Sequence, residues 1–273
     1  MITYRDLATA EDFGAVVDLE RRIWGPGYSD VVPAPILVVT VMRGGILVGA
    51  FEDTRLVGFV YSIAGLQVGK PMHWSHMLGV LEEFRGRGIG RQLKLLQRDR
   101  VIEMGLDRIE WTFDPMQALN AHLNFAKLGV VAEEYEPNVY GDSQSPLHRG
   151  NPTDRLIAQW HIREPHVERR LTASPLVVRS HELANVARLN HARPSGELPE
   201  CEQVDLGIDA RRVAVEIPTG FTTMLARAPD LALAWRMSTR LMFTTYFSRG
   251  YRAVDFTLDR AARTGAYLLV RQP

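Results

Sequence analysis

Apolar residues recur every three to four positions in several segments of the chain, which is the spacing that one buried face of an α-helix requires. Four segments with this spacing are predicted to be helices: residues 9–25, 89–104, 116–129 and 229–250. The first begins near Thr9, and acidic residues follow in its first turn, as is typical of a helix start. Gly129 and Gly250 mark the expected ends of two others.

Other apolar runs are rich in β-branched and aromatic residues and are bounded by turn residues, which predicts strands. They comprise residues 1–7, 44–52, 55–66, 74–81, 107–114, 130–141, 154–162, 211–218, 252–259 and 266–270. The second and third runs flank Asp53 and Thr54 and predict a hairpin. Residues 33–42 are largely apolar and fit a helix and a strand equally well.

A polar, proline-bearing segment, residues 163–174, predicts a boundary between two parts of the chain. We therefore expect an α/β domain over residues 1–162 and a smaller α/β domain over 163–273. The order strand–helix–strand–strand in the second part echoes the middle of the first. A degenerate lobe of the same topology is one interpretation of that echo.

The 32 Lys and Arg residues balance 32 Asp and Glu residues, so the formal net charge is zero. Proteins that bind nucleic acid usually carry a basic excess, which disfavours nucleic acid as a partner. No apolar run approaches the ~20 residues needed to span a bilayer, and the N-terminus has no apolar signal region. With one cysteine, Cys201, the composition predicts a soluble cytoplasmic protein without membrane association. The sequence leaves monomer and homodimer open.

The sequence RGRGIGR, residues 85–91, follows a predicted strand and opens a predicted helix, a position where backbone N–H groups commonly bind phosphate. A P-loop would require a lysine and a hydroxyl residue after the last glycine, where Arg91 and Gln92 stand. A dinucleotide-binding fingerprint that starts at Gly86 would require a third glycine at position 91. Both of these phosphate-binding motifs are therefore excluded.

A third pattern, [Q/R]-x-x-G-x-[G/A], is satisfied by Arg85, Gly88 and Gly90. Backbone N–H groups at the start of the following helix would favour a phosphate or pyrophosphate. Arg87 and Arg91 add positive charge beside that of Arg85. A glycine-rich turn with a solvated basic end is the alternative.

The segment MLGVLEEFRGRGIGRQLK, residues 77–94, resembles the fourth strand and pyrophosphate loop of the GNAT superfamily of acyl-CoA-dependent N-acyltransferases. The segment NAHLNFAKLG, residues 120–129, resembles a later helix of that superfamily, and the resemblance covers residues 1–162. It implies a GNAT fold, a mixed and mostly antiparallel sheet flanked by helices. A narrower resemblance, to a bacterial branch with an extra C-terminal domain, is carried by WTFDPMQALNAHLNFAKLG and PTDRLIAQW.

The resemblance implies acyl-CoA as co-substrate, with acetyl-CoA as the default donor, succinyl-CoA as the main variant, and no metal. In the superfamily the pantetheine arm lies between two splayed strands. Ala118 replaces an asparagine of the superfamily pattern, and nearby asparagines are candidates to take its place. The implied cofactor-binding residues are Leu78, Val80, Arg85, Gly86, Arg87, Gly88, Ile89, Gly90, Arg91, Asn120, Asn124 and Phe125.

N-acyl transfer needs a neutral amine, so a base with a pKa near the working pH assists it. In a regular strand, Trp74, His76, Leu78 and Val80 would share one face. Some GNAT N-acetyltransferases have a catalytic histidine at the position that His76 matches. His76 is therefore the candidate base, and a structural histidine packed beside Trp74 is the alternative.

Many superfamily members protonate the leaving thiolate with a tyrosine, and Phe125 stands at that position here. Another acid, water, or a domain that binds acyl-CoA without turnover are the remaining options. Tyr140 is the preferred candidate acid, ahead of Tyr135 and His122.

The leading hypothesis is an N-acyltransferase that acylates the amine of a small metabolite such as an amino acid. A non-catalytic acyl-CoA-binding or regulatory protein and a peptide or protein N-acetyltransferase are the alternatives. Asp154 and Arg155, before a predicted strand, could bind a substrate carboxylate or form a surface ion pair.

Overall fold

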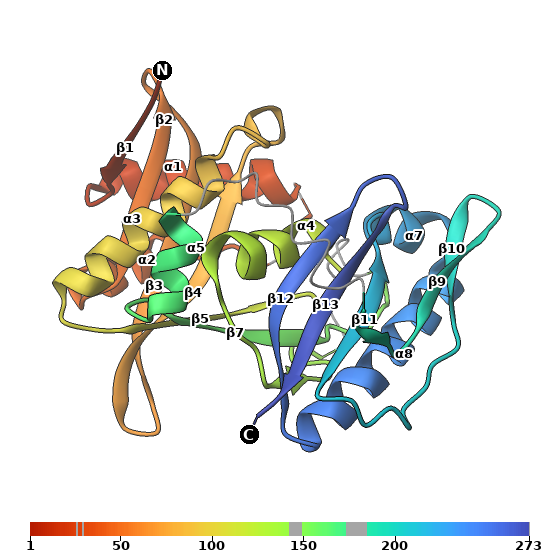
Figure 1. Ribbon diagram of the computed structural model, residues 1–273. Coiled ribbons are helices and arrows are strands. Elements are labelled where there is room, and N and C mark those ends of the chain that lie inside the picture. Colours follow the sequence, from red (N-terminus) through yellow and green to blue (C-terminus); the bar gives the residue numbers. More distant parts are fainter. Residues whose placement is uncertain (26, 29, 142–148, 173–184, 273) are drawn as a thin grey trace. The chain divides into compact units, whose positions relative to one another are not determined.

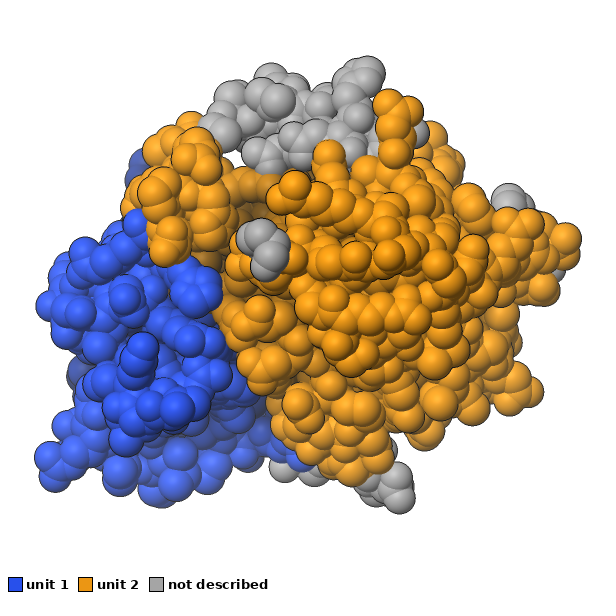
Figure 2. All heavy atoms as spheres, turned by 60° about the horizontal axis from the view of Figure 1, so that its bottom comes forward, with its two compact units in different colours: residues 1–111, 145–147, 161–163 blue, residues 112–144, 148–160, 164–273 orange. Residues whose placement is uncertain are grey.

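The computed structural model divides into two compact units, which Figure 2 shows in different colours. Unit 1 contains the described residues of Met1–Trp111 and His161–Arg163, and unit 2 those of Thr112–Gln144, His148–Trp160 and Glu164–Pro273. The structure describes residues 1–25, 27–28, 30–141, 149–172 and 185–272. The predicted domain boundary between residues 162 and 163 stays a prediction.

A mixed sheet forms the centre of unit 1, with its strands in the order β1-β2-β3-β4-β5 (Figure 1). These strands are β1 (Ile2–Asp6), β2 (Ile46–Glu52), β3 (Arg55–Gln67), β4 (Lys70–Val80) and β5 (Arg108–Phe113). Neighbouring strands are antiparallel except β4 and β5, which are parallel. The predicted mixed and mostly antiparallel sheet is confirmed.

Two consecutive hairpins join β2, β3 and β4. The first is the predicted one, and Asp53 in its turn has a φ of +54°. The second was not predicted: β3 continues to Gln67 and pairs there with Lys70, across a turn in which Val68 and Gly69 both have positive φ. Strand β4 therefore begins at Lys70 rather than at residue 74.

Three helices accompany this sheet: α1 (Ala10–Trp24), α2 (Ala34–Met42) and α3 (Ile89–Glu103). The predicted start of α1 is confirmed, because the Thr9 hydroxyl accepts a hydrogen bond from the Asp12 N–H at 3.2 Å. The Asp12 carboxylate accepts in return from the Thr9 N–H at 3.1 Å, which completes a capping box. The ambiguous segment 33–42 is helical, as α2.

Helices α1 and α3 lie on opposite faces of the sheet, as two glycines show. A Cβ added to Gly79 would meet Ile23 of α1, whereas one added to Gly58 would lie 3.5 Å from Ile89 of α3. Gly79 pairs with Phe59, the neighbour of Gly58 on β3, and neighbouring residues of a strand face opposite ways. Each face of the sheet is thus covered by a different helix.

Strand β4 contains a β-bulge at His76, because its register with β3 passes from Tyr61–Met77 directly to Ser62–Ser75. A bulge inserts one unpaired residue and changes which residues share a face. Among the described residues, β4 and β5 pair only at His73–Ile109 and Trp74–Glu110. Beyond this short ladder the edge of β4 is open toward β5.

The first part of unit 2 is less regular than predicted. The expected helix 116–129 is present as α4 (Ala118–Ala121) followed by a π-helical turn, His122–Leu128, that ends at Gly129 with a φ of +75°. The prediction of a strand over 130–141 was wrong for most of its length. Only β6 (Tyr135–Glu136) is a strand, and it pairs with β7 (Arg155–His161).

The C-terminal part of unit 2 contains a four-stranded sheet in the order β12-β13-β11-β8 and a hairpin of β9 and β10 (Figure 1). Its elements are α5 (Pro165–Thr172), β8 (Ala187–Arg188), β9 (His191–Ser195), β10 (Leu198–Glu202), β11 (Arg212–Pro218), α7 (Phe221–Arg227), α8 (Pro229–Ser248), β12 (Tyr251–Asp259) and β13 (Thr264–Arg271). Helix α5 occupies the predicted boundary segment. The degenerate GNAT-like lobe stays a prediction. None of the helices in the described residues is long and apolar enough to cross a bilayer.

Candidate functional site

The glycine loop lies where β4 ends and α3 begins. A short 3₁₀ turn, Glu82–Phe84, leads into it, and α3 starts at Ile89 without a side-chain cap. Gly86 and Gly88 have φ values of +78° and +80°, a region that costs other residues free energy. Both glycines let the chain turn into α3, whose first N–H groups have no partner within the helix and can bind an anion.

Two arginines of the loop are held by backbone carbonyls. Arg85 donates from Nε to the Val80 carbonyl at 3.1 Å, and Arg87 donates to the Glu83 carbonyl at 3.1 Å. The Arg87 guanidinium also lies 4.8 Å from the ring centre of Phe84. Arg85 has no ion pair with any described residue, so its charge is available to an anionic ligand. The loop therefore offers backbone donors and positive charge on one side of the helix end.

The bulge separates the residues that were expected to share a face. Val80 lies on the face of the sheet that α3 covers, 3.2 Å from a Cβ built on Gly58. Leu78 lies on the same face, 3.8 Å from a Cβ built on Gly90 of α3. His76 instead makes an edge contact with Tyr61, at 5.8 Å between ring centres. The Tyr61 hydroxyl donates to Thr40 of α2 at 2.7 Å, which places this pair on the opposite face. The expectation of one common face was therefore wrong.

The His76 residue is exposed, but the surrounding protein partly desolvates its imidazole. This desolvation lowers the pKa of His76 below the ordinary 6.5. It is therefore neutral near pH 7, as a proton acceptor must be. Its neighbour on the strand, His73, is buried, and burial lowers the pKa of His73 to about 4. His73 Nδ1 lies 3.0 Å from the Ser62 hydroxyl oxygen. His73 is thus a structural histidine, and His76 is the accessible one.

A buried lysine lies where β4 and β5 separate. Lys94 of α3 is 2% exposed and donates from Nζ to Ser75 at 3.0 Å and to Gln97 at 2.8 Å. Its Nζ also lies 3.5 Å from the ring centre of Trp111. Burial lowers the pKa of Lys94 well below the ordinary value. The sequence signal for it is a lysine inside the apolar stripe of α3, which the sequence analysis missed.

Glu20 is a second buried charge that the sequence analysis missed. It is fully buried on α1, and its carboxyl accepts a hydrogen bond from the Val32 N–H at 2.8 Å. Its other oxygen has no hydrogen-bond partner among the described residues. Burial raises the pKa of Glu20 from 4.5 to about 7. The carboxyl is therefore about half protonated at pH 7.

The Glu20→Gln substitution is expected to make folding less sensitive to pH. From pH 4.5 to about 7 the unfolded chain has lost the Glu20 proton while the folded chain keeps it, so the free energy of unfolding falls as pH rises. The loss across this window is about 3 kcal/mol. Denaturant unfolding of wild type and variant at several pH values from about 5 to 8 measures the difference. Identical pH dependence in both proteins would contradict this account.

Three of the predicted cofactor-binding residues, Asn120, Asn124 and Phe125, lie in unit 2 and differ in burial. Phe125 is fully buried and packs edge-on against Phe113 and Tyr267, at 6.0 and 5.6 Å between ring centres. A tyrosine hydroxyl in this aromatic cluster would need a buried partner, which gives a physical reason for phenylalanine. Asn124 is also buried, whereas Asn120 is exposed. Their predicted cofactor contacts stay predictions.

Tyr140 is exposed but fixed in place. Its hydroxyl lies 2.8 Å from the Thr112 hydroxyl, and its backbone N–H donates to Thr153 at 3.0 Å. Tyr135, the less favoured acid, is buried and donates to Asp154 at 2.7 Å. Burial and the Asp154 charge raise the pKa of Tyr135, so it releases a proton reluctantly. Of the two tyrosines, Tyr140 is the better candidate acid.

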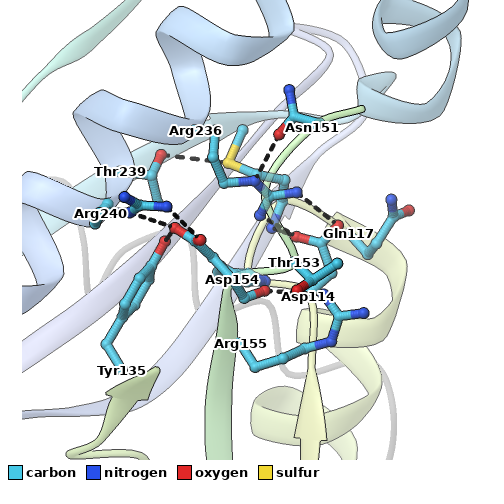
Figure 3. Close-up of polar contacts among 12 residues, drawn as sticks. Asp114, Gln117, Tyr135, Asn151, Thr153, Asp154, Arg155, Arg236, Thr239 and Arg240 are labelled. Atoms are coloured by element: carbon cyan, nitrogen blue, oxygen red, sulfur yellow. Dashed lines mark hydrogen bonds and ion pairs between the residues drawn. The ribbon is translucent and has the colours of Figure 1, made fainter. Parts of the chain in front are cut away.

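A network of buried charges joins α8 to the other elements of unit 2 (Figure 3). Arg236 is 1% exposed and donates to both carboxylate oxygens of Asp114, one of them at 2.9 Å, and to Asn151 at 3.1 Å. Arg240 donates to both oxygens of Asp154 at 2.6 and 2.8 Å. Burial alone would raise the pKa of each carboxyl, but the arginines outweigh it and lower both.

The described residues contain no cluster of histidine, cysteine, aspartate and glutamate that could hold a metal ion. The groups gathered in unit 1 are instead backbone donors, arginines and a neutral histidine. These suit an anionic ligand and proton transfer.

Residues 15–129 match the model of the acetyltransferase (GNAT) family. Among solved structures, a GNAT acetyltransferase from Streptococcus pneumoniae is 16% identical with a TM-score of 0.48, covering 58% of this chain and 98% of that one. Ribosomal-protein-S18-alanine N-acetyltransferase from Escherichia coli is 16% identical with a TM-score of 0.46, covering 58% and 92%. PaiA N-acetyltransferase from Thermoplasma acidophilum, in complex with coenzyme A, is 17% identical with a TM-score of 0.43, covering 59% and 99%. The comparison with curated proteins finds no match.

Proposed function

Residues 15–129 form a domain of the acetyltransferase (GNAT) family, and from this premise we propose that the protein moves an acyl group from acyl-CoA to the amine of a small metabolite, such as an amino acid. Acetyl-CoA is the proposed donor, with succinyl-CoA as the main variant. The observation that carries the proposal is the glycine loop 85–91 at the uncapped start of α3, beside the open edge of β4.

The pyrophosphate of CoA is assigned to this loop. The N–H groups of Ile89 and Gly90 belong to the first helical turn and have no partner within the helix. Arg85, which lacks an ion pair among the described residues, supplies charge beside them. The open edge of β4 offers backbone donors and acceptors to the amides of the pantetheine arm.

His76 is the proposed base of the transfer. The amine nitrogen attacks the thioester carbonyl, a C–N bond forms, the C–S bond breaks, and the amine proton passes to His76 directly or through water. The lowered pKa of His76 keeps its imidazole neutral for this role at neutral pH. Tyr140 is the proposed proton donor to the leaving thiolate.

The replacement of the usual tyrosine by Phe125 supports one competing function, an acyl-CoA-binding protein without turnover. The two functions differ in a single measurement, the release of CoA from acetyl-CoA and succinyl-CoA with a panel of amino acids and other small amines. Amine-dependent release supports the enzyme. Binding of acyl-CoA without release for any amine of the panel or for peptides would overturn it.

Gly88→Ala is expected to weaken CoA binding roughly tenfold, whereas Gly90→Ala is expected to leave it nearly unchanged. An alanine at the Gly88 φ of +80° costs ~1–2 kcal/mol, so the free loop would relax and turn its N–H groups away. At Gly90 an added Cβ would make only an ordinary contact with Leu78, at 3.8 Å. Titration calorimetry with CoA measures both affinities. Equal affinities for the two variants would contradict the assignment of the loop.

A further inference from the structure

The buried network of unit 2 holds one more positive than negative side chain. Its cations and anions are Arg155, Arg236, Arg240, Asp114 and Asp154 (Figure 3). Each carboxylate is already bound by two donors of a single arginine: Asp114 by Arg236, and Asp154 by Arg240. Arg155 is therefore the cation left without a carboxylate.

Asp114 and Asp154 act on Arg155 through their charges, but neither forms an ion pair with it. Arg155 begins β7, is half-buried, and points away from the Asp154 carboxylate (Figure 3). Among the described residues it has no ion pair, and its guanidinium donates one hydrogen bond, to the Asp154 backbone carbonyl at 2.9 Å. Burial lowers the pKa of Arg155, whereas the paired Arg236 and Arg240 have raised pKa values. A guanidinium has five N–H donors, so most of them remain for a ligand.

The ring of Tyr140 adjoins this guanidinium. The Tyr140 ring lies 5.2 Å from Arg155 Cζ, and its hydroxyl is 2.8 Å from that of Thr112. Thr153 fixes the backbone of Tyr140 at 3.0 Å. A carboxylate that pairs with a guanidinium keeps lone pairs that hydroxyl donors can satisfy. Charge, donors and partial exposure thus suit a carboxylate more closely than a neutral group.

We propose that Arg155, beside the ring of Tyr140, binds a carboxylate carried by one of the two substrates. The carboxylate belongs either to the acceptor amine or to the far end of a dicarboxylic acyl group. This assignment rests on the proposed acyl transfer and names the chemical class that it uses. Arg155 acts as a specificity-determining residue, because it holds a group away from the reacting atoms.

The kinetic test compares four combinations of substrates. Each amino acid of a panel is offered as the free acid and as its α-carboxamide, with acetyl-CoA and with succinyl-CoA, to wild type and to Arg155→Gln. If the acceptor carries the carboxylate, Arg155→Gln lowers the ratio of acid to amide in kcat/KM by about 10- to 100-fold. If the acyl group carries the carboxylate, Arg155→Gln instead lowers the ratio of kcat/KM with succinyl-CoA to kcat/KM with acetyl-CoA. An equal change in all four arms, or no change, overturns the proposal.

Two further variants separate binding from structure. Arg155→Lys keeps a charge but not the planar fork, and is expected to keep part of the preference. Arg227→Gln is the matched control, because Arg227 forms an exposed ion pair with Glu197 on the same unit. Arg155→Gln is expected to unfold at the same temperature as wild type or higher, since it removes an unpaired, half-buried charge.

A binding measurement decides the inference even if no amine is acylated. Phenylglyoxal modifies arginine side chains, and mass spectrometry of the Arg155 peptide reports how far each free acid or its amide slows the reaction. Protection by acids and not by amides supports the carboxylate site, whatever the activity. Absence of protection by every acid and by succinyl-CoA overturns it, while amine-dependent CoA release would still support the acyltransferase.

Discussion

His76→Ala is expected to lower kcat/KM for acyl transfer by about 10²- to 10⁴-fold, the usual contribution of general acid–base catalysis. CoA binding should be retained, because the glycine loop begins at Arg85 and His76 lies in the bulge of β4. If His76→Ala lost CoA binding as well as activity, the cause would be a disturbed β4 strand rather than a missing base.

The pH profile gives His76 a signature that packing alone would not produce. Because the pKa of His76 is lowered from 6.5, the wild-type profile of kcat/KM should rise with pH and inflect below 6.5. This limb should vanish in His76→Ala. His191→Ala is the matched control, as its side chain is half exposed on β9 of unit 2. Wild-type rates and an unchanged acidic limb in His76→Ala would remove His76 from the mechanism.

Arg236→Met is expected to lower the free energy of unfolding of unit 2 by about 3–5 kcal/mol. The substitution leaves Asp114 charged and without its two arginine donors, and leaves Asn151 without its guanidinium partner. Denaturant unfolding measures the loss, followed by the near-ultraviolet signal of aromatic residues such as Trp235, which is buried beside Arg236.

A double variant separates the ion pair from the volume of the side chain. Arg236→Met with Asp114→Leu should recover a large part of the stability, because no uncompensated buried charge remains. Arg227→Met, which breaks an exposed ion pair, should cost no more than about 1 kcal/mol. If Arg236→Met is as mild as Arg227→Met, the network contributes little and Asp114 finds other partners.

Local signals in the sequence predicted the elements whose causes are themselves local. The capping box at Thr9, the turn at Asp53 and the helix stop at Gly129 each depend on a few neighbouring residues. The family resemblance supplied the mixed and mostly antiparallel sheet, which no local pattern contains. Segment 33–42 stayed ambiguous because its apolar residues fit both periods.

The predictions that were wrong concern structure that depends on interactions with distant parts of the chain. The bulge at His76 depends on how β4 registers with β3, so parity counted along β4 alone placed His76 on the wrong face. Residues 130–141 have the composition of a strand, but only Tyr135–Glu136 finds a ladder, against β7. The buried charges Lys94 and Arg236 each interrupt an apolar helix stripe. That interruption was a readable signal, although their partners were not.

The most direct test of the central claim is the stability of the purified wild-type protein with CoA, acetyl-CoA and succinyl-CoA at matched concentrations. At ~100 times its dissociation constant, a bound ligand raises the free energy of unfolding by about 2.7 kcal/mol. The account predicts a clear rise with CoA itself, a larger one with the true donor, and a reduced rise in Gly88→Ala. No rise with any of the three, in protein that remains folded, would contradict acyl-CoA binding at residues 85–91 and the transferase with it.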